Sequence, residues 1–275
     1  MTHSLRTTPS VGVSTWALHH ELGAPPVWGV EAGAAVPQFE ARDGSISLLQ
    51  LPALLKERGF DCWQICHFHL PSRDAVYLDE LRAASADAGL SLHALLVDAG
   101  DITQGANGQR DADWIASWMP VAARLGASNL RVIAGQTTRD GALDESARHL
   151  LNLARLGTAN GVGVITENWF DLLATPDAVL ELMARTAEHV ELLLDWSNWS
   201  GPHKYEHLAL IAPLARSCHA QVEFNGAAHI NRDDCKRCLQ LPYPDSFDGP
   251  FVLVNGGLQG IEVARDAIRE SWRAS

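Results

Sequence analysis

Eight short apolar segments recur along this chain at nearly regular intervals, and they constrain its fold more than any other feature. They are rich in aliphatic and β-branched residues and lie at 11–15, 60–66, 91–97, 129–134, 161–166, 190–194, 218–222 and 251–254. Counted over the seven intervals from residue 11 to residue 251, they begin about every 34 residues. Runs that are apolar on both faces are typical of strands in a parallel sheet covered by helices on each side.

Segments with apolar residues at helical spacing separate most of these strands. They lie at 47–58, 75–88, 111–125, 144–160, 175–188, 205–215 and 262–272. Eight strands that alternate with helices predict a single-domain (β/α)8 barrel of the TIM type. An eight-stranded doubly wound sheet is the alternative. It would place a glycine-rich turn after the first strand, and residues 15–20, TWALHH, are not such a turn.

A chain of 275 residues suits one large domain, and we expect residues 1–275 to form it. The segment from about residue 19 to residue 45 is the main irregularity, because it is rich in glycine and proline and far longer than an ordinary strand-to-helix connection. Connections of that length are usually functional loops.

Composition narrows the class of protein. With 47% hydrophobic and 20% charged residues the chain is expected to be globular rather than disordered. It contains neither the ~18 uninterrupted apolar residues of a membrane span nor a secretion signal at its start, so we expect a cytoplasmic protein without a membrane partner. The net charge of −12 disfavours nucleic-acid binding. Five cysteines, an odd number, are expected to be reduced thiols; a homodimer stays open.

Polar residues end three of the predicted strands and a fourth lies within the seventh strand, in the part of a barrel where its active site is built. They are Glu167, Asp195, His219 and Asn255, from the fifth to the eighth strand in order. Two carboxylates and an imidazole suit Mn²⁺, Mg²⁺, Co²⁺ or Zn²⁺. Each residue alone is as well explained as the cap of a strand, but three on consecutive strands favour a common site.

Other residues near strand ends are candidates for substrate contacts. His67 and His69 follow the second strand and either bind substrate hydroxyls or bond the rim loops. Trp16 and Trp169 offer faces on which sugar C–H groups pack, or they pack the rim itself. Lys204 follows the sixth strand, where it either attracts an anionic substrate or is solvated.

Three further charged residues lie near strand ends. Asp98 and Asp101 flank Gly100 after the third strand and either bond sugar hydroxyls or cap the next turn, and the second role is favoured. Arg131 lies near the start of the fourth strand, the end of the barrel away from the site.

The order Glu, Asp, His on strands five, six and seven resembles the pattern of the xylose isomerase-like TIM barrel superfamily. The resemblance covers nearly the whole chain, from residue 11 to the last helix. Several segments are similar to one branch, known as sugar phosphate isomerase/epimerase: 65–70 (ICHFHL), 95–101 (LLVDAGD), 131–135 (RVIAG), 166–170 (TENWF) and 195–199 (DWSNW).

This resemblance implies that Glu167, Asp195 and His219 bind a divalent metal ion, that Glu167 also moves the substrate proton, and that the substrate is a small carbohydrate. The fourth ligand of the superfamily is usually a glutamate, in some members an aspartate, at the end of strand eight. Asn255 stands there in this chain and would have to bind through its amide oxygen.

Two more positions depart from or supplement the pattern. Glu223, four residues after His219 and on the same strand face, is a candidate to substitute for the missing carboxylate. Asn198 stands where the epimerases of the superfamily carry a histidine, so that substrate contact is expected to differ.

The leading expectation is a metal-dependent isomerase or epimerase of a sugar or polyol ketone that works through an enediolate. A dehydratase or lyase of a keto-sugar or inosose is the alternative, and the missing second carboxylate fits it slightly better. An apurinic endonuclease would need a three-zinc set of histidines and acids that this sequence does not supply. A non-catalytic barrel subunit or sensor would be favoured if no metal were bound.

Overall fold

Eight parallel strands close into a barrel in which each strand pairs with its neighbours in sequence. The barrel closes between the first and last strands, where Gly12 pairs with Val252. The computed structural model describes residues 8–23, 44–225 and 229–273. The strands are β1 Val11–Ser14, β2 Cys62–Cys66, β3 Ser91–Val97, β4 Asn129–Val132, β5 Gly163–Glu167, β6 Glu191–Asp195, β7 Ala215–Ala220 and β8 Phe251–Leu253. The predicted (β/α)8 barrel is confirmed.

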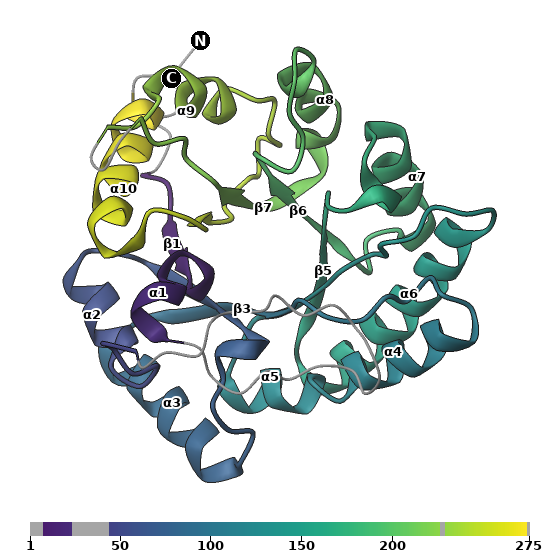
Figure 1. Ribbon diagram of the computed structural model, residues 1–275, viewed down its shortest axis with the longest axis horizontal. Helices are drawn as coiled ribbons and strands as arrows, with labels where there is room; N and C mark the ends of the chain where they lie inside the picture. The colour runs from purple at the N-terminus through teal and green to yellow at the C-terminus, as the bar shows by residue number, and fades with distance from the viewer. Residues whose placement is uncertain (1–7, 24–43, 226–228, 274–275) are drawn as a thin grey trace.

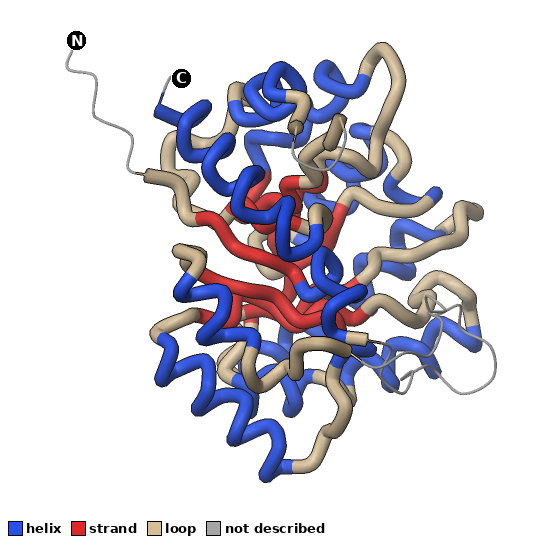
Figure 2. The backbone as a smooth tube through the Cα atoms, turned by 60° about the vertical axis from the view of Figure 1, so that its left-hand side comes forward, coloured by secondary structure: helices blue, strands red, loops and turns tan. Residues whose placement is uncertain are grey.

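Helices form a ring outside the strands (Figure 1), and the strands lie in the middle of the molecule (Figure 2). Within the described residues the α-helices are α1 His19–Leu22, α2 Leu51–Glu57, α3 Ala75–Ala88, α4 Ala106–Ala116, α5 Met119–Leu125, α6 Ala142–Asn160, α7 Pro176–Thr186, α8 Lys204–Ile211, α9 Arg232–Leu239 and α10 Gly257–Arg273. Short 3₁₀ turns, η1 Thr15–Leu18, η2 His67–His69, η3 Asp171–Leu173 and η4 Ala212–Leu214, follow β1, β2, β5 and α8.

The barrel has two apolar layers. Between strands and helices lies the large core that the apolar strand runs predict, because each strand buries one of its faces there. The inside of the barrel is filled by a smaller cluster of buried residues: Cys66, Phe68, Ala94, Leu96, Ile165 and Leu193. This inner cluster reaches the carboxyl ends of the strands, because Cys66 is the last residue of β2 and Phe68 lies in the turn that follows it.

Proline explains two differences from the predicted helices. The segment predicted as one helix at 111–125 is divided into α4 and α5, because Pro120 lies in the first turn of α5 and starts a new helix. The helix predicted at 205–215 ends at Ile211, since Pro213 follows it in the 3₁₀ turn η4.

The helix α9 was not predicted from the sequence. The eight-residue α9 begins after Asn231, whose side chain accepts a hydrogen bond from the backbone N–H of Asp234. Acidic residues in its first turn and basic residues in its last turn suit the helix dipole. The helix is too short to produce a clear periodic pattern.

The predicted loop from about residue 19 to residue 45 is only partly described. His19–Leu22 forms the short helix α1 rather than loop, and residues 24–43 lie outside the described residues. All five cysteines are buried free thiols. Within the described ranges no helix combines the length and apolarity that a bilayer span requires.

Candidate functional site

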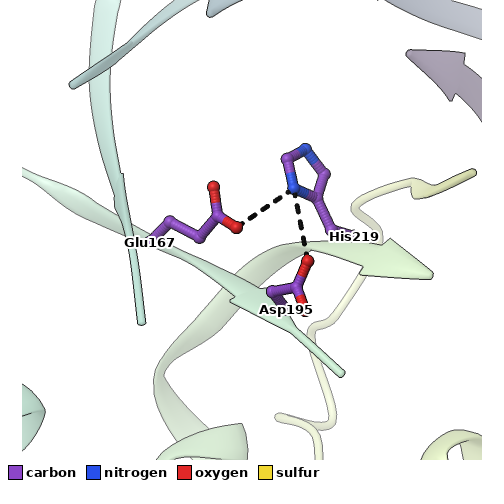
Figure 3. Close-up of side chains that lie close together, drawn as sticks. All are labelled: Glu167, Asp195 and His219. Atoms are coloured by element: carbon purple, nitrogen blue, oxygen red, sulfur yellow. Dashed lines mark ion pairs between the residues drawn. The ribbon is translucent and has the colours of Figure 1, made fainter. Parts of the chain in front are cut away.

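Glu167, Asp195 and His219 converge at the carboxyl end of the barrel (Figure 3). Glu167 and Asp195 are the last residues of β5 and β6, and His219 pairs in register with Asp195. One ligand atom from each residue lies within 4.8 Å of the other two. His219 Nδ1 is 3.4 Å from Glu167 Oε1 and 3.7 Å from Asp195 Oδ2. The structure therefore brings together the three residues that the sequence placed at neighbouring strand ends.

Asp195 is oriented by the loop that follows it. Its Oδ1 accepts hydrogen bonds from the backbone N–H groups of Ser197 (2.6 Å) and Asn198 (2.9 Å), which leaves Oδ2 to face His219. Burial would raise the pKa of Asp195, but the hydrogen bonds and charge of His219 and the bonds from Ser197 hold it below its ordinary value. The group is therefore a carboxylate at neutral pH.

His219 is fixed from the opposite side of the barrel. Its Nε2 donates to Oε1 of the buried Gln64 on β2, at 2.8 Å, so Nδ1 is the nitrogen that faces the two carboxylates. Burial alone would lower the pKa of His219, but Glu167 and Asp195 outweigh it and raise the pKa to about 9. Without a metal ion the imidazole is protonated between two carboxylates.

These three residues fit a divalent cation. They supply two carboxylate oxygens and one imidazole nitrogen, a set that Mn²⁺, Mg²⁺, Co²⁺ and Zn²⁺ accept. The Gln64–His219 hydrogen bond is the kind of outer support that histidine ligands usually have. Asp195 Oδ1 and His219 Nε2 form hydrogen bonds with other protein groups. The remaining atoms, Asp195 Oδ2 and His219 Nδ1, point toward each other and toward Glu167.

The triad lines a cavity of about 130 Å³ to which every strand contributes. The lining residues that lie in a strand or directly after it, from the first strand to the eighth, are Ser14, Cys66, Asp98, Arg131, Glu167, Asp195, His219 and Val254. Trp16, Leu96, Trp169, Asn198 and Gln221 complete the lining. The predicted substrate contacts Asn198, Trp16 and Trp169 thus lie at this cavity. Asn198 also orients the triad, since its Nδ2 donates to Glu167 Oε1 at 2.8 Å.

Arg131 lines this cavity, contrary to the expectation that it lies at the other end of the barrel, and Asp98, for which capping of a turn was favoured, lines it too. Arg131 is buried in β4, where it pairs in register with Leu96 and Ile165 of the inner apolar layer. Its long side chain starts in that layer and reaches up to the cavity. One guanidinium nitrogen donates to Asp98, and Nε lies 3.5 Å from Glu167 Oε2.

Asn255 is not brought to the triad. Its Nδ2 donates to the carbonyl of Val222 at 2.7 Å, and the residue lines a neighbouring pocket of about 490 Å³. Val254 lines the triad's cavity instead, because successive side chains of an extended chain point to opposite sides. The strand-eight position of the site is therefore apolar.

Glu223 and Lys204 also line the neighbouring pocket rather than the triad's cavity. Glu223 accepts a hydrogen bond from Asn231 at 2.7 Å, so it does not replace the missing carboxylate. Lys204 forms an ion pair with the buried Asp234 at 2.8 Å.

His67 and His69 are buried and do not line the triad's cavity. His67 Nδ1 accepts a hydrogen bond from the backbone N–H of Asp98 at 3.1 Å, so it supports the strand-three side of the cavity. His69 Nδ1 lies 2.8 Å from the hydroxyl of Thr15. Burial lowers the pKa of His69 to about 3, and the ring is neutral at physiological pH.

A family model described as xylose isomerase-like TIM barrel matches residues 52–237. No curated protein matches this sequence. Solved structures similar in fold include a xylose isomerase-like TIM barrel protein from Mycobacterium smegmatis in complex with magnesium, at 17% identity and a TM-score of 0.67, covering 99% of each chain. A second is D-psicose 3-epimerase from Clostridium cellulolyticum H10 with D-tagatose; it has 12% sequence identity and a TM-score of 0.62, and the match covers 96% of each chain. A probable 3-DHS dehydratase from Bacillus anthracis has 13% identity and a TM-score of 0.63, covering 94% of this chain and 97% of its own.

Proposed function

The chain belongs to the xylose isomerase-like TIM barrel family, and we propose that it is a divalent-metal-dependent isomerase or epimerase of a sugar or polyol ketone. The observation that carries this proposal is the convergence of Glu167, Asp195 and His219 within 4.8 Å in a buried cavity at the carboxyl ends of three consecutive strands. The D-psicose 3-epimerase with a similar fold supports the carbohydrate class of substrate.

Glu167, Asp195 and His219 would hold the metal ion, and that ion would polarise the substrate carbonyl and a neighbouring hydroxyl. Glu167 takes the proton from the carbon next to the carbonyl. Its Oε2 is buried and has no hydrogen-bond partner among the described residues, whereas Oε1 is held by Asn198. Returning the proton to the same carbon on its other face gives an epimer; returning it to the neighbouring carbon, while the hydroxyl proton passes to the former carbonyl oxygen, gives an isomer.

The charges around the cavity favour an uncharged substrate over a sugar phosphate. Arg131 is paired with Asp98, and Lys204 in the neighbouring pocket is paired with Asp234. A phosphate would have to compete with these carboxylates for the two cations.

A dehydratase is the second candidate, and Val254 is the observation that favours it. Epimerisation by two bases needs a second proton donor on the other face of the substrate, and the strand-eight wall of the cavity is apolar. Elimination of a β-hydroxyl after proton removal needs only one base. The probable 3-DHS dehydratase with a similar fold supports this alternative.

Solvent-deuterium exchange tests both candidates. Purified protein loaded with Mn²⁺ is incubated in D₂O with free ketohexoses (fructose, psicose, tagatose and sorbose) and with an inosose, and each product is identified by NMR. We expect deuterium at the carbon next to the carbonyl, no exchange after treatment with EDTA, and none in Glu167→Gln, which keeps the side-chain shape but loses the base. Epimer or isomer identifies the first function, and a dehydrated ketone identifies the second. Full exchange in Glu167→Gln would exclude Glu167 as the base.

A further inference from the structure

Arg131 places a permanent positive charge at the floor of the cavity. The guanidinium stays protonated at any physiological pH, and its side chain is only 2% exposed. The backbone of Arg131 pairs in register with Leu96 and with Ile165, which lies two residues before Glu167 along β5. Its side chain extends from there and lines the same cavity as the triad.

The guanidinium is anchored on one side and has a donor left on the other. Asp98 accepts a hydrogen bond from one terminal nitrogen, and Trp169 lies with its ring centre 5.4 Å from the guanidinium carbon. Nε is 3.5 Å from Glu167 Oε2, which is too long for a hydrogen bond, and neither atom has another hydrogen-bond partner among the described residues. The free N–H of Arg131 and the free oxygen of Glu167 thus lie side by side.

Stability does not explain a buried arginine in this layer. Two buried charges lose their hydration, and replacing such a pair by apolar residues of similar size is often neutral or stabilising. The neighbouring side chains Leu96 and Ile165 are apolar, and the guanidinium otherwise faces the backbone carbonyl of Val97 and Glu167 Oε2, each at 3.5 Å. Asp98 balances the charge of Arg131, but this pairing alone does not account for a buried arginine. Both residues line the cavity, so a role of Arg131 in that cavity accounts for it.

We propose that Arg131 is a catalytic residue whose Nε–H donates a hydrogen bond to the substrate oxygen that becomes negatively charged when Glu167 removes the adjacent proton. This inference rests on the proposed function. The substrate C–H bond breaks, its electron pair forms the carbon–carbon double bond, and the carbonyl π pair moves onto the oxygen. The proton resides on Glu167 until it returns to carbon, and Arg131 keeps its own proton throughout.

Such a donor acts on the intermediate more than on the substrate. A neutral ketone gains little from a guanidinium already paired with Asp98, whereas an enediolate brings a full charge to the free N–H. Interactions that strengthen only as charge develops accelerate the reaction instead of tightening substrate binding. The ligand class recognised by Arg131 is therefore a small planar oxyanion, of which a hydroxamate is a stable mimic.

The test compares Arg131→Met and Arg131→Lys with Arg124→Met, which removes an arginine from an exposed ion pair with Asp79 outside the cavity. Each protein is loaded with Mn²⁺ and measured by calorimetry with glycolohydroxamate and by deuterium exchange with the ketohexoses above. Arg131→Met is expected to lose about 10²- to 10³-fold in the rate constant of exchange, as for removal of an oxyanion donor, with KM changed less than about threefold. Hydroxamate affinity is expected to fall by a similar factor while Mn²⁺ affinity stays within about threefold.

Arg131→Lys keeps the charge without the fixed Nε–H and is expected to fall between wild type and Arg131→Met. Because Arg131→Met leaves Asp98 buried without its partner, the double variant Arg131→Met/Asp98→Asn removes both charges and carries the same test if the single variant does not fold. Wild-type hydroxamate affinity in either folded variant would overturn the proposal. If the wild type exchanges no ketose but loses hydroxamate affinity on Arg131→Met, the proposed substrate class fails and the role of Arg131 as the oxyanion donor is supported.

Discussion

Gln64 and His219 meet across the barrel, 155 residues apart, with Gln64 Oε1 2.8 Å from His219 Nε2. The contact joins β2 to β7 and fixes which ring nitrogen faces the carboxylates. Gln64→Leu removes the acceptor and should weaken Mn²⁺ binding about 10- to 100-fold, the usual effect of losing an outer partner of a histidine ligand. Gln64→Glu keeps an acceptor and should retain most of the affinity. Calorimetric titration with Mn²⁺ measures both, and equal affinity in wild type and Gln64→Leu would show that the contact does not support the metal site.

A glutamate at position 254 should create the carboxylate that the strand-eight wall lacks. Val254 lines the triad's cavity, whereas Asn255 is turned toward the carbonyl of Val222. We expect Val254→Glu to tighten Mn²⁺ binding at least about tenfold, because hard cations favour charged oxygen ligands, and to lower stability when metal is removed. Asn255→Glu is the matched control and should leave the affinity near that of wild type. The opposite order of affinities would mean that Asn255 faces the metal.

Asn198 should govern the orientation of Glu167 more than the affinity for metal. Its Nδ2 donates to Glu167 Oε1 at 2.8 Å. In Asn198→Leu the carboxylate loses this anchor, and we expect deuterium exchange to slow by about 10- to 100-fold because small displacements of a catalytic group are costly. Mn²⁺ affinity should change by less than about threefold. A loss of metal binding that accounts for the whole loss of exchange would contradict the orienting role.

His93 should make the fold sensitive to acid. Burial, together with the charge of the nearby His219, lowers its pKa to about 4, whereas the unfolded chain has the ordinary value of 6.5. Below pH 6.5 the unfolded chain takes up a proton that the folded protein does not, so stability is complete above that pH and falls toward pH 4. The total loss is up to about 3 kcal/mol. Urea unfolding with EDTA at pH 7 and pH 4.5 should show a smaller loss for His93→Gln than for wild type; the same loss in both would contradict this origin.

The sequence predicts the barrel and the convergence of the triad for the same reason. Buried parallel strands are recognisable by their apolar runs, and Glu167 and Asp195 each close such a run. Asn255 was misplaced because the end of β8 is uncertain by one residue in sequence, and one residue reverses the face of an extended chain.

Arg131 was misplaced for a different reason. The sequence places it near the start of the fourth strand, whereas β4 spans only Asn129–Val132, and from its third position the long side chain reaches the cavity. Its partner Asp98 lies on another strand, and no spacing within the sequence reports that pair. Contacts that pass between layers of the barrel become visible only in three dimensions.

The cavity receives a contribution from every one of the eight strands, and this arrangement has an evolutionary consequence. Each rim position can mutate while the backbone hydrogen bonds of its strand and of both neighbours stay intact. A rim position can carry an aliphatic residue, as at Val254, and an arginine can reach the cavity from within its strand, as at Arg131, without a different scaffold. The type of reaction can therefore diverge through single amino-acid substitutions while the barrel stays the same.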